Sequence, residues 1–173
     1  SLDVTQNRKE HLYSIIINFL NKIQKKLEPK RWQDDWNHWW AQRFNNFDFL
    51  PTTIEKSLEI GCGPYTNTRL ILQKSTINHI TCSDPLARHY VAFNKGWLSW
   101  ACRNQKILID DHPAEDIPFA SNIFDLVIMI NVLDHVQDAE KCINQAMRVT
   151  KPNGILVIGQ DVTAKNVPSD TCH

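Results

Sequence analysis

The chain has 173 residues, of which 42% are hydrophobic and 22% are charged. This length indicates one domain with a small appendage. The composition is that of an ordinary globular protein, which excludes disordered and collagen-like chains. Nineteen basic side chains balance nineteen acidic ones, so the charge gives no reason to expect nucleic acid or an anionic membrane surface as a partner.

Five cysteines are spread widely along the chain, and none belongs to a CxxC pair. An odd number of cysteines without a signal peptide argues against a disulfide framework and for a reducing compartment, so we expect a cytoplasmic protein. No apolar run reaches the roughly 18 residues of a membrane-spanning helix.

The first 50 residues have a helical pattern. Apolar side chains recur at three- and four-residue spacing between Leu12 and Leu27, and four tryptophans follow in a similar pattern between Trp32 and Phe44. We expect residues 1–50 to form a helical extension. Two roles remain open for it, either packing on the main domain or forming a lid over a ligand, in which Arg43 would meet an anionic group.

Strands and helices alternate over residues 51–173, which we expect to form the main domain. Strands are predicted at 57–60, 79–82, 107–109, 124–130 and 155–158, and helices at 66–74, 86–93, around Trp97 and Trp100, and at 138–150. A turn is predicted at 152–154. The alternation indicates parallel β-α-β units with right-handed crossovers. The two apolar strands at 124–130 and 155–158 fit a sheet covered on both faces.

The segment from Glu59 to Pro64 joins the first strand to the next helix. Gly61 and Gly63 make a tight turn, and their missing side chains let a ligand approach the backbone. Asp84 ends the second strand, where a carboxylate can accept hydrogen bonds from both ribose hydroxyls. Because it precedes a proline, Asp84 is also a candidate helix N-cap.

Six segments, each at the end of a predicted strand or helix, together resemble the class I S-adenosylmethionine-dependent methyltransferases, in particular the type 11 small-molecule group. The resemblance spans residues 56–161 and implies a Rossmann-like, mostly parallel sheet with helices on both faces. The segments are Glu59-Ile60-Gly61-Cys62-Gly63-Pro64, Ser83-Asp84-Pro85-Leu86, Ala114-Glu115-Asp116-Ile117-Pro118-Phe119, Phe124-Asp125-Leu126-Val127, Asn131-Val132-Leu133-Asp134-His135-Val136 and Arg148-Val149-Thr150-Lys151-Pro152-Asn153-Gly154.

The resemblance implies S-adenosylmethionine as the cofactor and assigns its methionine end to the glycine turn. Gly61 and Gly63, with Cys62 between them, would pass under the methionine part and the ribose. Glu59 would help to fix the turn and the amino end of the cofactor. The backbone at Asn131 would face the methionine amino group.

The adenosine part is assigned to two further segments by the same resemblance. Asp84 would hold the ribose hydroxyls, and Pro85 and Leu86 would lie along the adenine. Ala114 and Glu115 would contact the edge of the adenine ring.

The sequence departs from the family pattern at two positions. Tyr65 stands where a third glycine is frequent, and Pro113 stands where many members have an acidic residue that binds the adenine amine. Asp110 or Asp111 is a candidate substitute for that carboxylate. These departures keep open a methyltransferase-like binding module that does not catalyse.

His135 is the candidate catalytic residue. It follows the fourth strand beside Asp134, where an imidazole could act as general base toward an oxygen or nitrogen nucleophile. The alternative is that His135 only orients the loop by hydrogen bonds. Tyr65, Tyr90 and the tryptophan-rich helix are candidates for the acceptor pocket.

No metal site is predicted, because the histidines at 38, 79, 89 and 112 lack metal-ligand spacing with a cysteine or carboxylate. The expected function is methyl transfer to an oxygen or nitrogen nucleophile of a small molecule. A nicotinamide-dependent oxidoreductase is the weaker alternative, because its glycine fingerprint would need glycine where the chain has Thr66.

The length limits the sheet that this chain forms. The resemblance implies seven strands, but five are predicted by residue 158, and the last 15 residues are too few for two more strands and a helix. We therefore expect the main domain to be incomplete at its C-terminal end, and the alternative is a shortened sheet with an exposed edge that needs cover.

Overall fold

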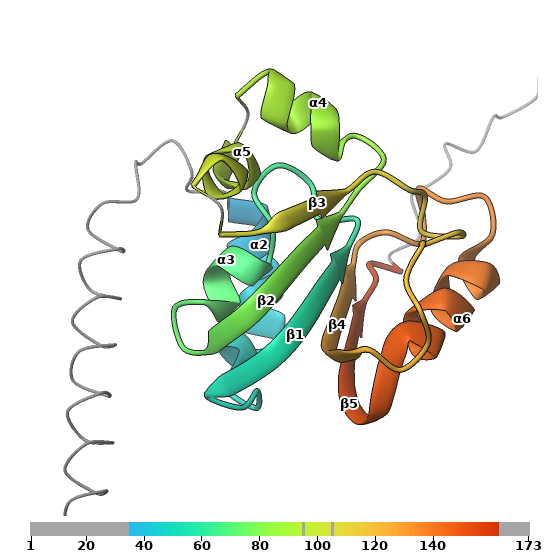
Figure 1. Ribbon diagram of the computed structural model, residues 1–173. Coiled ribbons are helices and arrows are strands. Elements are labelled where there is room, and N and C mark those ends of the chain that lie inside the picture. The colour runs from blue at the N-terminus through green and yellow to red at the C-terminus, as the bar shows by residue number, and fades with distance from the viewer. Residues whose placement is uncertain (1–34, 95, 105, 163–173) are drawn as a thin grey trace, which may run out of the picture.

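The computed structural model describes residues 35–94, 96–104 and 106–162 (Figure 1). The helix predicted between Leu12 and Leu27 lies outside this part of the chain. The tryptophan-rich stretch is helical from Asp35 to Arg43.

Helices and strands follow one another in the alternating order that the sequence indicates. In chain order they are α2 (Asp35–Arg43), the 3-10 helix η2 (Asn45–Phe47), β1 (Thr53–Ile60), α3 (Thr68–Ile71), β2 (Thr76–Ser83), α4 (Ala87–Ala92), α5 (Gly96–Arg103), β3 (Leu108–Asp110), β4 (Phe124–Ile130), α6 (Ala139–Val149) and β5 (Thr150–Gly159).

The described strands form one parallel sheet in the order β3-β2-β1-β4-β5. The chain builds outward from β1 through β2 to β3 and then crosses to β4 on the other side of β1. The carboxyl ends of β1 and β4 therefore lie where the direction of winding reverses, which is where open α/β sheets bind ligands. The predicted α/β class and parallel sheet are confirmed.

Helices cover both faces of the sheet, as predicted. Figure 1 shows α6 on one side and α2, α3 and α5 on the other. Side chains along β4 pack alternately against the two helix layers, since successive side chains of a strand point to opposite faces of the sheet. Leu126 and Ile128 are buried in the cluster that contains α3 and α5 residues, and Val127 and Met129 are buried in the cluster that contains α6 residues.

Helix α2 packs on the sheet through part of its tryptophan stripe. Trp40 is 5% exposed and joins the core, whereas Trp36 is 49% exposed. Gly159 at the end of β5 makes this packing possible, because a Cβ there would lie 2.9 Å from ring atoms of both Trp40 and Phe44. The role of the whole 1–50 extension as packing element or lid remains a prediction.

Several predicted element bounds are wrong by a few residues. β1 and β2 begin earlier, at Thr53 and Thr76. The helix predicted at 66–74 is only the four residues of α3. The turn predicted at 152–154 lies inside β5, where the pairing with β4 shifts register between Phe124 and Leu126. Asn153 has a φ of 65° there, so the bend is absorbed as a bulge rather than ending the strand.

None of the described helices has the length and apolar character needed to cross a bilayer.

Candidate functional site

A buried carboxylate organises the loop after β1. Glu59 is 1% exposed, and its two oxygens accept four hydrogen bonds. The donors are the backbone and side-chain groups of Asn67, at 2.7 and 3.1 Å, and of Thr68, at 2.8 and 2.6 Å. Burial raises the pKa of Glu59 above its ordinary value, and the bonds from Thr68 and Asn67 oppose that rise. Glu59 thus ties the start of α3 to the end of β1.

The glycine turn lies between Glu59 and α3. Gly61 has a φ of 67°, and a Cβ on it would come within 2.4 Å of Val132, so only glycine fits there. The amides of Gly61 and Cys62 donate to the carbonyl of Ser83 at the end of β2. Thr66 also has a positive φ, 57°, which is costly for a β-branched residue and places backbone strain in this loop.

A cavity of about 900 Å³ opens at the carboxyl ends of β1, β2 and β4, and we call it the large cavity. It is large enough for a small-molecule cofactor. Its lining includes most of the residues that the sequence assigns to cofactor binding, namely Gly61, Asp84, Pro85, Leu86, Ala114, Glu115 and Asn131, together with His135. These segments are far apart in the sequence, and the parallel sheet brings them to one edge.

Asp84 links the glycine turn to the start of α4. Its Oδ2 accepts from the amide of Gly63 at 3.0 Å, and its Oδ1 accepts from the amide of Leu86 at 2.8 Å. The second bond is the local turn expected of a capping aspartate. A carboxylate offers about four acceptor positions, so the two bonds leave Asp84 able to accept from a ligand in the large cavity.

Glu115 holds the loop before α6 while it borders the large cavity. Its Oε1 accepts from the amides of Gln137, at 2.9 Å, and Asp138, at 3.5 Å. Burial opposes ionisation of Glu115, but backbone hydrogen bonds outweigh it and lower its pKa. The ionised form is therefore favoured, and Oε2 accepts no hydrogen bond from another of the described residues.

His135 lies on the rim of the large cavity. Its side chain is 70% exposed, and Nε2 lies 3.6 Å from Oδ1 of Asp134. The imidazole is thus accessible from the cavity and stands beside a carboxylate. Both the general-base and the loop-orienting interpretations remain compatible with this position.

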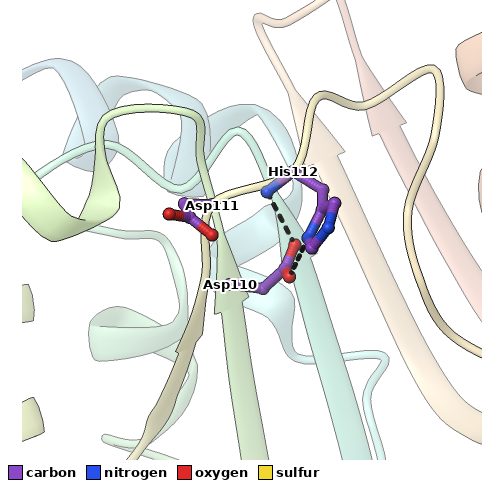
Figure 2. A group of neighbouring side chains, drawn as sticks. All are labelled: Asp110, Asp111 and His112. Atoms are coloured by element: carbon purple, nitrogen blue, oxygen red, sulfur yellow. Dashed lines mark hydrogen bonds and ion pairs between the residues drawn. The ribbon is translucent and has the colours of Figure 1, made fainter.

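Asp110 and Asp111, the candidate substitutes for the missing acidic residue, do not line the large cavity. Figure 2 shows Asp110, Asp111 and His112 together at the end of β3, and their potential ligand atoms lie within 4.8 Å of one another. Asp110 accepts from Ser83 at 2.8 Å and contacts Nδ1 of His112 at 2.7 Å. Its acceptor capacity is thus used within the protein.

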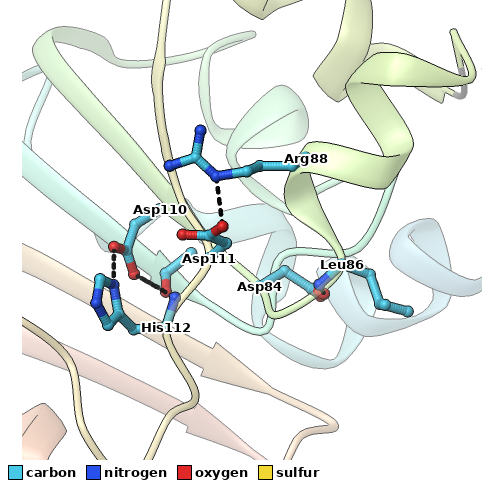
Figure 3. Close-up of polar contacts among 7 residues, drawn as sticks. Asp84, Leu86, Arg88, Asp110, Asp111 and His112 are labelled. Atoms are coloured by element: carbon cyan, nitrogen blue, oxygen red, sulfur yellow. Dashed lines mark hydrogen bonds and ion pairs between the residues drawn. The ribbon is translucent and has the colours of Figure 1, made fainter.

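Arg88 of α4 reaches Asp111 and forms an ion pair with it, while the contact between Asp84 and Leu86 lies at the neighbouring strand end (Figure 3). The hydrogen bond from Arg88 lowers the pKa of Asp111, and the hydrogen bond to Asp110 raises the pKa of His112. These bonds account for the grouping of the three side chains, and the absence of a metal site remains a prediction.

A second cavity, of about 240 Å³, lies between α2 and the glycine turn, and we call it the tryptophan cavity. Gly61 and Asn131 line both cavities, so the two adjoin there. Asn131 has a φ of 57°, and its amide donates to the carbonyl of Gly159 at 2.7 Å. Cys62 and Gly63 line the tryptophan cavity rather than the large one, and Glu59 lines neither.

Sequence reasoning assigned no binding role to Asn67 or Lys141, which line the tryptophan cavity and the large cavity respectively. It named the tryptophan-rich helix as a candidate for the acceptor pocket, and Trp40 of that helix lines the tryptophan cavity. Trp40 belongs to a stripe whose spacing also suits a packing helix, and Asn67 has no local motif. Tyr90 and Tyr65, the candidates for the acceptor pocket, line the large and the tryptophan cavity respectively.

The model of a family described as a methyltransferase domain matches residues 58–158, more than half of the chain. Norajmaline N-methyltransferase of Rauvolfia serpentina is 39% identical over 120 residues, which cover 68% of this chain and 40% of that protein. Ajmaline N-methyltransferase of the same plant is 27% identical over 114 residues, covering 65% and 38%. This chain thus spans about two fifths of the length of these curated relatives.

Solved structures share the fold at low sequence identity. The YcgJ protein of Bacillus subtilis has a TM-score of 0.57 and 18% identity, covering 70% of this chain and 50% of that one. Phosphoethanolamine N-methyltransferase 2 of Haemonchus contortus, solved with phosphomonomethylethanolamine and S-adenosylhomocysteine, has a TM-score of 0.56 and 21% identity, covering 69% and 28%.

Proposed function

This chain belongs to the methyltransferase domain family, and we propose that it transfers a methyl group from S-adenosylmethionine to a nitrogen or oxygen nucleophile of a small molecule. The observation that carries the proposal is the large cavity at the reversal point of the sheet, bordered by the glycine turn, Asp84 and Glu115. The two Rauvolfia relatives are named as N-methyltransferases, which favours a nitrogen acceptor.

The residues present fit S-adenosylmethionine. Asp84 keeps acceptor capacity for ribose hydroxyls, and Gly61 leaves the backbone open beside it. Oε2 of Glu115 can accept from an adenine amine in the place of the acidic residue that Pro113 replaces. When bound, the cofactor supplies a methyl group on a positively charged sulfur, which a nucleophile attacks in line with the departing sulfur.

The protein's part in this reaction is mainly positioning. Residues of the large cavity would hold donor and acceptor at attack distance and displace water from between them. His135, on the rim and 3.6 Å from Asp134, would take the proton that an ammonium or hydroxyl acceptor must lose.

A calorimetric titration of the full chain tests the cofactor assignment. We expect S-adenosylmethionine and S-adenosylhomocysteine to bind with one-to-one stoichiometry and NAD⁺ to give no heat of binding. Binding of NAD⁺ alone would favour the oxidoreductase. A folded chain that binds S-adenosylmethionine but methylates no amine or alcohol in a broad panel would favour a non-catalytic module, the alternative that the departures at Tyr65 and Pro113 keep open.

Substitution of His135 separates its two possible roles. His135→Asn should leave the affinity for S-adenosylhomocysteine unchanged and lower the methylation rate about 100-fold, the size of a general-base contribution. The loss should be largest below the acceptor's own pKa, where a proton must be removed. An unchanged rate at every pH would leave His135 only the loop-orienting role.

A further inference from the structure

Helix α4 borders the large cavity, although little apolar burial holds it in place. Leu86, which precedes the helix, and Tyr90, which belongs to it, both line the cavity. Of the helix residues Ala87–Ala92, only Ala87 is buried, and Figure 1 shows the helix standing apart from the sheet. A helix of this length is not stable by itself, so its position depends on the polar contacts that tie it to neighbouring segments.

The segment that follows β3 forms another wall of the large cavity. Residues 113–116 line the cavity, and Asp111, the first residue after β3, lies just before them in the chain. Helix α5 and strand β3 separate this segment from α4 in the sequence. A contact between Asp111 and α4 therefore fixes two walls of the cavity relative to each other.

Arg88 of α4 makes this contact. Its Nε donates a hydrogen bond to Oδ2 of Asp111 within an ion pair, as Figure 3 shows. This bond raises the pKa of Arg88 and lowers the pKa of Asp111, so both groups are charged at neutral pH. Neither side chain lines the large cavity. The ion pair therefore acts on a bound ligand only through the two walls that it joins.

The chain around Asp111 is anchored to the sheet. Asp110, at the end of β3, accepts from the hydroxyl of Ser83 in β2 at 2.8 Å and from the amide of His112 at 3.2 Å. Figure 2 shows the carboxylate of Asp110 directed toward His112, whereas Asp111 points away from both. Because the hydrogen bonds of Asp110 fix this segment, Arg88 ties α4 to a fixed point.

We propose that Arg88 and Asp111 form a clasp that holds α4 against the segment after β3 and slows the release of a ligand held between Leu86 and residues 113–116. Arg88 is then a positioning residue, which sets the place of Leu86 and Tyr90, two residues away on either side of it. The inference rests on the proposed function, because the ligand retained in the large cavity would be the cofactor or its demethylated product.

Arg88→Gln tests the clasp, because it removes the charge and keeps a polar side chain. Surface plasmon resonance on the immobilised full chain measures how fast S-adenosylhomocysteine binds and leaves. We expect its dissociation rate to rise about two- to fivefold, the range that exposed ion pairs contribute. Its association rate should change less than about twofold. A dissociation rate equal to that of the unsubstituted protein would overturn the inference.

Salt and charge reversal distinguish the clasp from a merely structural role of Arg88. Raising the ionic strength from about 0.05 M to about 0.5 M screens an exposed ion pair, so it should speed release from the unsubstituted protein and leave release from Arg88→Gln unchanged. Arg88→Asp should release the ligand faster, and its combination with Asp111→Arg should restore slow release. If Arg88→Gln does not fold, the salt dependence of the unsubstituted protein decides, and its absence contradicts the clasp.

Lys74→Gln is the matched control. It breaks another exposed ion pair, with Asp48, and neither of these residues lines the large cavity or the tryptophan cavity. This substitution should leave the association and dissociation rates of S-adenosylhomocysteine unchanged. An equal effect of Lys74→Gln and Arg88→Gln would trace the change to a general loss of stability, and the inference would then be wrong.

The outcomes separate this inference from the proposed function. If the unsubstituted protein does not bind S-adenosylhomocysteine, the proposed function fails and the inference fails with it. If the protein binds S-adenosylhomocysteine and Arg88→Gln releases it at an unchanged rate, the function stands and the clasp is wrong. The same conclusion follows if the doubly substituted protein releases the ligand as fast as Arg88→Asp does.

Discussion

At the scale of single residues, Glu59 has the most consequences for its surroundings. Its two oxygens accept the hydrogen bonds that four donor groups of Asn67 and Thr68 would otherwise make to water. These bonds determine where the glycine turn ends and α3 begins. The cost of burying this charge is visible in its raised pKa. Such a carboxylate stabilises the fold only as long as all of its partners remain in place.

Glu59→Gln should destabilise the protein, although it removes a buried charge. The amide retains one acceptor oxygen and directs its NH₂ toward backbone or side-chain donors, which leaves at least one of them unpaired. A buried unpaired donor costs about 1–3 kcal/mol, and we expect the free energy of unfolding in urea to fall by that amount.

Glu55→Gln serves as the control for this change. Glu55 lies on the same strand but is exposed, and its substitution should alter the free energy of unfolding by less than about 0.5 kcal/mol. Equal effects of the two substitutions would contradict the role given to Glu59.

At the scale of elements, Asp125 connects three neighbouring strands at the end opposite the cavities. From the start of β4 it accepts from the amide of Lys56 in β1 at 3.0 Å and from Nζ of Lys151 in β5 at 2.8 Å. The hydrogen bond from Lys151 lowers the pKa of Asp125. These contacts hold β1, β4 and β5 together at the end of the sheet opposite the cavities.

Asp125→Asn should change the pH dependence of stability. Because the carboxylate has a lower pKa in the folded state, its stabilisation is fully present above the ordinary aspartate pKa and is lost as the pH falls through the folded value. The variant should therefore be less stable than the parent at pH 7, and the difference should shrink as the pH falls below the ordinary aspartate pKa. The side chains of Lys151 and Asp125 are 38% and 34% exposed, so water screens their ion pair. The difference in the free energy of unfolding at pH 7 should therefore stay below about 1 kcal/mol.

Urea unfolding at pH 7, 5 and 3 measures this difference. The exposed Asp116 provides the control, since Asp116→Asn should alter the free energy of unfolding by less than about 0.5 kcal/mol. A difference for Asp125→Asn that is the same at all three pH values would show that the ion pair with Lys151 contributes nothing.

At the scale of the whole molecule, residues from both halves of the sheet line the two cavities. Their linings combine the ends of β1 and β2 with the loops after β3 and β4, and the tryptophan cavity adds α2. A ligand that fills them would contact segments that otherwise meet only through the sheet and the core. It should therefore stabilise the molecule as one cooperative unit.

A thermal unfolding experiment measures this linkage. A ligand that binds only the folded state at about 100 times its Kd stabilises by about 2.7 kcal/mol, which raises the Tm of a domain of this size by about 5–11 °C. We expect this shift with S-adenosylhomocysteine and none with NAD⁺ at the same concentration. An unchanged Tm at saturating S-adenosylhomocysteine would contradict binding in these cavities.

Much of the fold follows from local patterns. The apolar strands, the helix of 138–150 and the glycine turn depend on neighbouring residues, and their kinds and order are as expected. Their ends were harder to place. The hydrogen bonds of Glu59 end the loop at Asn67, and the pairing of β5 with β4 absorbs the bend at Asn153. The first effect joins residues eight apart in the sequence, and the second joins two strands that α6 separates in the chain.

By itself the sequence determined the alternation of strands and helices, the family resemblance and the set of segments that border the large cavity, because each strand of a parallel sheet carries its following loop to the same edge. Only the tertiary structure decided that Asp110 and Asp111 pair within the protein. It also decided that Trp40 and Asn67 share a cavity. Contacts of this kind depend on how the helices pack on the sheet and on which polar atoms remain unpaired. No local pattern of residues encodes either.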